Sequence, residues 1–126
     1  MEEPFVYKDL SYKINGCLFE VYNALGAGLK EKTYQDALAV VFSEQGLIFE
    51  REVRLPILFH EMNVGTSILD FLVNNSIVVE LKIGEYYSRK NMEQILEYLK
   101  AHDLKLGLLA NFTREGVRIK RIVNIR

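Results

Sequence analysis

The stretch TSILDFLVNNSIVVELKI, residues 66–83, places the strongest constraint on how this chain can fold. Its two apolar halves, 66–73 and 76–83, are joined through Asn-Asn, which predicts two antiparallel strands and a tight turn. A three-residue loop, 74–76, would set Asp70 opposite Glu80. A two-residue loop would set Asp70 against Val79, because a slip of one residue exchanges every face. We adopt the three-residue register, since it pairs similar residues at most other positions.

The two acids of this hairpin would repel each other. Like charges directly opposite on a sheet are destabilising, and apolar surroundings screen them poorly. A raised carboxyl pKa or a cation between the oxygens would relieve the repulsion, and Mg²⁺ is usually held by such oxygens beside substrate phosphates. Lys82, on the same face as Glu80, suits a reaction in which negative charge develops on a phosphoryl oxygen. The alternatives are an acid that meets solvent at a strand end, and a plain surface salt bridge between Lys82 and Glu80.

Hydrophobic periodicity places the other elements around the hairpin. It predicts helices over 9–25, 30–45 and 88–102, and strands over 51–59, 104–112 and 116–123. Pro56 places the first of these strands at an edge, and HEMNVG (60–65) reads as a turn. The order α-α-β-β-β-α-β-β predicts an α+β fold, a mixed sheet flanked by helices, because the third helix crosses over to a buried strand. A length of 126 residues fits one domain, 1–126.

Polar side chains on two predicted helices extend the candidate site. Glu31 lies on the apolar face of its helix, so its carboxylate points inward unless it meets solvent in the first turn. Asn91, Gln94 and Tyr98 form a polar stripe on the third helix. This stripe either bonds to a site or to phosphates, or rims the core.

The charge balance excludes general attraction to a polyanion. The net charge is −1, so a nucleic-acid binder of this kind needs local positive patches or metal ions. Arg118 and Lys120 share a face of the last strand, as a phosphate-contacting strip or as a charged edge that discourages strand pairing. Cys17 is the single cysteine, the first ten residues are acidic and contain Pro4, and no apolar run is long enough to span a membrane. We therefore expect a cytoplasmic protein without a membrane segment.

Three motifs carry a family resemblance. The segment GLKEKTY, 28–34, is similar to the pattern of the GxxExxY proteins, with Gly28, Glu31 and Tyr34 in place. Asp70 followed by VELK (79–82), together with QILEY (94–98), resembles the motifs of the PD-(D/E)XK nuclease superfamily, in the branch that carries Q-x-x-x-Y. The resemblance extends from about residue 12 to residue 123.

This resemblance implies a restriction-endonuclease-like αβββαβ core and a nuclease that uses Mg²⁺ or Mn²⁺ to hydrolyse phosphodiester bonds. We expect DNA as the substrate, with RNA as the alternative. The implied metal ligands are Asp70, Glu80, the Leu81 carbonyl and Glu31. Lys82 would position or activate the attacking water, and Gln94 and Tyr98 would order the site or the nucleic acid. We expect nucleic-acid contacts from Asn91, Arg118 and Lys120.

Two other function classes are alternatives to the nuclease: a non-catalytic module and a glycosidase. A non-catalytic nucleic-acid-binding or assembly module could use the same fold, and the small size leaves open a homodimer or a protein partner. Two opposed acids also suit a glycosidase. The lysine beside them and the absence of tryptophan argue against that enzyme class.

Overall fold

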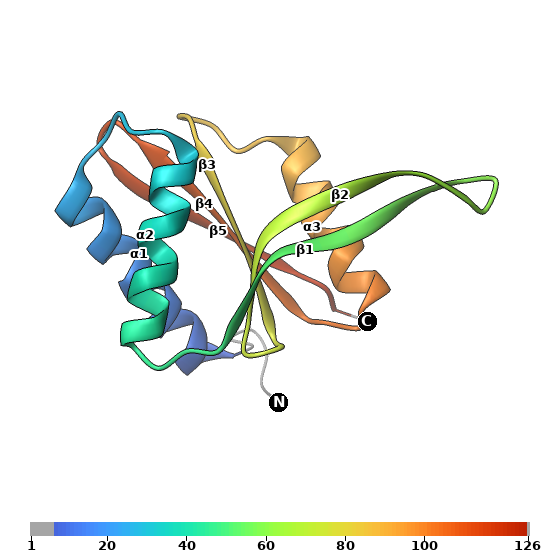
Figure 1. Ribbon diagram of the computed structural model, residues 1–126, viewed down its shortest axis with the longest axis horizontal. Coiled ribbons are helices and arrows are strands. Elements are labelled where there is room, and N and C mark those ends of the chain that lie inside the picture. Colours follow the sequence, from blue (N-terminus) through green and yellow to red (C-terminus); the bar gives the residue numbers. More distant parts are fainter. Residues whose placement is uncertain (1–6, 126) are drawn as a thin grey trace.

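Five strands form one mixed sheet that carries helices on both faces (Figure 1). The computed structural model describes residues 7–125, so the acidic start with Pro4 lies outside it. The elements are α1 (Lys8–Leu25), α2 (Glu31–Glu44), β1 (Phe49–Phe59), β2 (Met62–Val73), β3 (Ile77–Ile83), α3 (Arg89–Ala101), β4 (Leu106–Thr113) and β5 (Gly116–Val123). This confirms the predicted element order and the α+β class.

The sheet has the spatial order β1-β2-β3-β4-β5, with β1 at an edge as Pro56 predicted. Strands β3 and β4 pair in parallel, and the other neighbours pair antiparallel. The parallel pair requires a crossover, which α3 supplies. Every residue of β4 is buried, as expected for a strand covered on both faces.

Two apolar clusters hold the layers together, one on each face of the sheet. Helices α1 and α2 cover one face, where Tyr34, Leu38 and Phe42 of α2 are fully buried. Helix α3 covers the other face through Ile95 and Leu99. Within residues 7–125, no helix is both long and apolar enough to cross a membrane.

The two hairpin turns differ in how well the sequence predicted them. Val73 pairs with Ile77, which confirms the three-residue loop 74–76. The expected turn over 60–65 is wrong: β2 begins at Met62, and only His60 and Glu61 form the turn. Both residues have positive φ, 51° and 64°. A two-residue turn of this kind matches the natural twist of a β-ribbon and lets the strands run on to the tip.

Strand β2 changes faces at Asp70. Phe71 packs in the cluster under α1 and α2, whereas Leu69 packs in the cluster under α3. Residues two apart on a regular strand share a face, so the alternation expected through Asp70 is wrong. Opposite this point in β1, Glu52 has a φ of +56°, and the pairing of β2 with β3 stops at Phe71–Val79. The predicted backbone pair of Asp70 with Glu80 therefore does not form.

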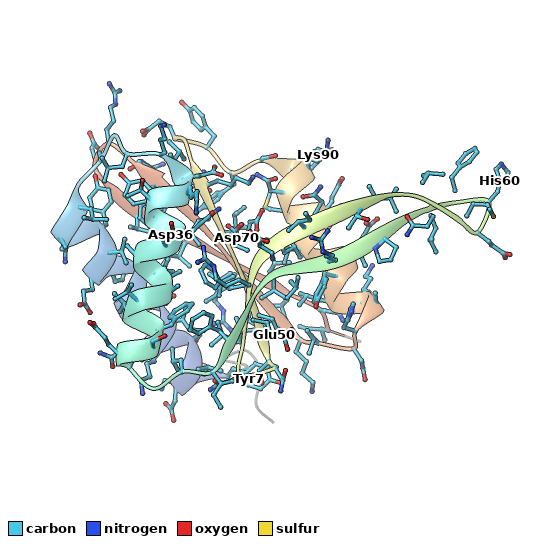
Figure 2. All side chains as sticks on the ribbon, in the orientation of Figure 1. Tyr7, Asp36, Glu50, His60, Asp70 and Lys90 are labelled. Atoms are coloured by element: carbon cyan, nitrogen blue, oxygen red, sulfur yellow. The ribbon has the colours of Figure 1, made fainter. Side chains whose placement is uncertain are left out.

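Beyond this twist, the β1–β2 hairpin leaves the body of the molecule. We call residues 54–68 the arm, the part of the hairpin distal to the Val53–Leu69 pair. Figure 1 shows the arm extending past α3, and Figure 2 places His60 at its tip, far from Asp70.

Candidate active site

The candidate site lies where β2 separates from β3. The Asp70 N–H donates to Glu80 Oε1 at 2.9 Å, and the Leu81 N–H donates to Asp70 Oδ2 at 2.8 Å. These two contacts take the place of the ladder hydrogen bonds that end one residue earlier. Both carboxylates are thus fixed by backbone groups of the opposite strand, and the local separation of the strands makes room for them.

Burial gives the acid pair unusual protonation behaviour. Glu80 is 3% exposed. Burial, then the charge of Asp70, raises the pKa of Glu80 to about 8, and a hydrogen bond between the two side chains adds to the rise. Burial also raises the pKa of Asp70, against the opposing effect of the Leu81 N–H. Two carboxylates that resist ionisation together form a site that favours a cation.

Lys82 and Glu31 supply charge on either side of this pair. The Lys82 ammonium lies 3.7 Å from Glu80 Oε2, and it lowers the pKa of both acids without cancelling the effect of burial. Glu31 Oε2 accepts from the Ile83 N–H at 3.3 Å. The charge of Glu31 raises the pKa of Asp70. Glu31 therefore faces the site from the first turn of α2, as its position predicted.

The loop before α2 explains how Glu31 is placed. Gly28 has a φ of +93°, a conformation that other residues rarely adopt. The Tyr34 hydroxyl donates to the Gly26 carbonyl at 2.6 Å and accepts from the Leu29 N–H at 3.2 Å. Its ring packs on Phe112 with centroids 4.3 Å apart. Gly28 and Tyr34 thus fix the start of the helix that carries Glu31.

Of the two α3 residues predicted at the site, Gln94 contacts β2 and Tyr98 lies in the core. Gln94 Nε2 donates to Ser67 Oγ at 3.5 Å, and Ser67 lies three residues before Asp70 on β2. Tyr98 is 4% exposed and stacks on His102 at 4.1 Å. Burial and then the charge of Glu50 raise its pKa. Tyr98 thus belongs to the core beneath α3, one helical turn beyond Gln94.

The predicted nucleic-acid contacts lie on β5 and in the first turn of α3. Arg118 is in register with Asn111, which is in register with Lys82, so the three form one row across the sheet. Arg118 also donates to the Glu85 carbonyl at 3.3 Å. Lys120 is exposed two residues further along β5. Asn91 lies in the first turn of α3, where its N–H donates to the Ser88 cap at 3.3 Å.

Sequence reasoning missed two residues of the site. Gln35 Nε2 donates to Asp70 Oδ1 at 3.0 Å, which orients that carboxylate from α2. Its spacing of four residues from Glu31 places both on one side of the helix and could have identified it. Asn111 Nδ2 donates to the carbonyls of Gly84 and Tyr86, at 3.3 and 2.8 Å. It thereby fixes the loop that follows Lys82.

The donor set fits a hard divalent ion held by two carboxylates. Among residues 7–125, no group of three or more Asp, Glu, His or Cys side chains is placed to hold a metal ion, and ligation by Glu31 stays a prediction. Mg²⁺ is commonly bound by only one or two protein carboxylates, with water and substrate phosphates completing its shell. The buried, mutually repelling pair Asp70 and Glu80 suits that arrangement. Leu81 meets the site through its N–H, and ligation by its carbonyl stays a prediction.

Comparisons with known proteins identify one matching family model and one similar solved structure. A family model described as the PD-(D/E)XK nuclease superfamily matches residues 8–122. A search of curated proteins gave no significant match. A crystal structure of the protein SSO0001 is similar with a TM-score of 0.49 and 13% identity, over 94% of this chain and 79% of that one.

Proposed function

The chain belongs to the PD-(D/E)XK nuclease superfamily, and on this basis we propose that it is a Mg²⁺- or Mn²⁺-dependent nuclease that hydrolyses phosphodiester bonds in DNA, with RNA as the alternative substrate. The observation that carries the proposal is the buried pair Asp70 and Glu80 with the Lys82 ammonium 3.7 Å from Glu80. The Gly28, Glu31 and Tyr34 motif further supports membership of the GxxExxY group. Cys17, a buried free thiol, fits a cytoplasmic setting.

In this proposal the protein's contribution is to hold charge in fixed positions. Asp70 and Glu80 hold the ion, which supplies charge stabilisation at a phosphoryl oxygen and a more acidic water. The Leu81 N–H and Gln35 keep the Asp70 carboxylate in one orientation, and the Asp70 N–H does the same for Glu80. Each acid therefore needs little rearrangement when substrate arrives.

Lys82 is the residue proposed to act on the attacking water. Its side chain is a third exposed, so its ammonium reaches both Glu80 and solvent. From there it can orient a water toward the phosphorus and stabilise the charge that develops on the phosphoryl oxygens. Glu31 adds negative charge at the end of β3, and Gln94 holds Ser67 of β2 on the α3 side.

The test is cleavage of plasmid and single-stranded DNA and of RNA, with Mg²⁺, with Mn²⁺ and with chelator. Lys82→Ala and Asp70→Asn should each lower the rate by at least about 100-fold. Lys100→Ala, which alters an exposed lysine of α3, is the matched control and should retain full activity. Cleavage that is unchanged in Lys82→Ala protein would come from a contaminant. Metal-independent binding without cleavage of any substrate would instead support a non-catalytic binding module.

A further inference from the structure

The arm, residues 54–68, exposes more apolar surface than its own two strands can cover. Six large apolar side chains on it are between 46% and 66% exposed: Ile57, Leu58, Phe59, Met62, Val64 and Ile68. Figure 2 shows the tip of the hairpin, at His60, standing beyond both helix layers, whereas the base of the arm contacts α3 through Ser67 and Gln94. Apolar side chains gathered in this way on a soluble protein mark an interaction surface.

We propose that the arm is the surface through which two copies of this chain associate. The first support is the strand pairing. Between Met62 and Leu69, β2 pairs with β1 alone, and its pairing with β3 begins only at Phe71. Within the described chain, both strands of the arm thus have one unpaired edge. A two-stranded ribbon alone is only marginally stable in water, and unpaired apolar edges favour the addition of further strands.

Charge argues for a second copy rather than for nucleic acid. Among the fifteen residues of the arm, only Arg54 and Glu61 carry a full charge. Most protein–DNA hydrogen bonds go to the phosphate and sugar backbone, and arginine and lysine are prominent among the donors. The arm contains neither residue beyond Arg54 at its base. Two copies of the arm would meet without like-charge repulsion, and the net charge of −1 on the whole chain opposes association little.

The area available is sufficient for a specific dimer. We take about 150 Å² for a fully exposed large apolar side chain, the low end for an aromatic residue. The six side chains then offer roughly 500 Å² on each copy, divided between the two faces of the ribbon because consecutive strand residues such as Leu58 and Phe59 point to opposite faces. An interface in which the two ribbons wrap around each other and use both faces buries about 1,000 Å² for a pair, the lower limit for a specific interface, and backbone hydrogen bonds between strand edges add to it. A symmetric pairing uses the same patch on both copies, so each substitution acts twice.

The test is sedimentation equilibrium of the full chain at about 1 to 100 µM. The wild-type protein should form dimers, and Phe59→Glu should raise the dissociation constant at least about 100-fold, because a charge enters the interface in both copies. Phe59 is 63% exposed, so the variant should keep its fold. Tyr12→Glu is the matched control: it places the same charge at a 69% exposed site on α1 and should leave the dimer intact.

Hydrogen exchange of the wild-type protein provides a measurement that depends on no variant. The arm amides should be protected at high protein concentration and exchange faster below the dissociation constant. The proposal fails if the wild-type protein is a monomer at 100 µM, if Phe59→Glu still dimerises, or if Tyr12→Glu dissociates equally. It also fails if the arm amides of a dimer stay unprotected, or if DNA protects them in a monomer.

Discussion

Replacing Glu80 with glutamine should remove most of the pH dependence of stability in the metal-free protein. The carboxyl of Glu80 has an ordinary pKa of 4.5, raised by burial and by Asp70 to about 8 in the folded state. The unfolded chain therefore loses this proton first as pH rises, and the folded state is progressively disfavoured between about pH 4.5 and 8. A difference of this size corresponds to about 5 kcal/mol above pH 8, comparable to the whole stability of a small domain.

Urea denaturation with chelator at pH 5, 6.5 and 8 measures this effect. The wild-type free energy of unfolding should fall across the series, and Glu80→Gln should be nearly flat, apart from the smaller contribution of Asp70. Glu97→Gln, at an exposed position of α3, should behave like the wild type. Mg²⁺ should restore the wild-type stability at pH 8 and do little for Glu80→Gln. A wild-type protein equally stable at pH 5 and 8 would refute the reasoning.

Three further predictions concern packing and positioning. Gly107→Ala should lower the free energy of unfolding in urea by about 1–3 kcal/mol, because the new Cβ would lie 2.4 Å from Ile95 Cγ2. Gly16→Ala is the matched control: its Cβ would enter open space on α1, so the free energy of unfolding should rise by up to about 1 kcal/mol. Tyr34→Phe should lower the unfolding free energy by about 1–3 kcal/mol, since the Gly26 carbonyl and Leu29 N–H lose their partner; an unchanged value would contradict this. Gln35→Ala should weaken Mn²⁺ binding at least about 10-fold by calorimetry, and wild-type affinity would exclude its positioning role.

The elements were predictable where local pattern and burial agree. Tyr34, Leu38 and Phe42 recur at helical spacing and are buried in α2. Asn74 and Asn75 adopt positive φ, which asparagine tolerates well, so their pair correctly predicted the three-residue loop. The early end of the turn at Glu61 was missed, because polar residues such as Asn63 suggest a loop when they in fact lie on an exposed ribbon.

The sequence predicted which residues lie at the site better than it predicted how they are arranged. The predicted hairpin register placed Asp70 and Glu80 close together. The change of face at Asp70 accompanies the packing of Leu69 under α3 and of Phe71 under α1 and α2. No periodicity within a single strand encodes that twist. Tyr98 sits at the border of two helix faces, so spacing alone could not decide between the site and the core. Gln35 was missed because its role depends on a carboxylate 35 residues away.

The length of the arm can vary without disturbing the rest of the protein. Residues 57–65 lie beyond the Pro56–Thr66 pair, so shortening this segment reduces the reach of the ribbon while the twist at Asp70 stays in place. Such changes keep the two strands paired in register only when residues are lost in matched pairs, one from each strand. An unmatched deletion needs a bulge like the irregularity between Ile57 and Leu58 to absorb it. Relatives of this chain should therefore differ in ribbon length mostly by even numbers of residues.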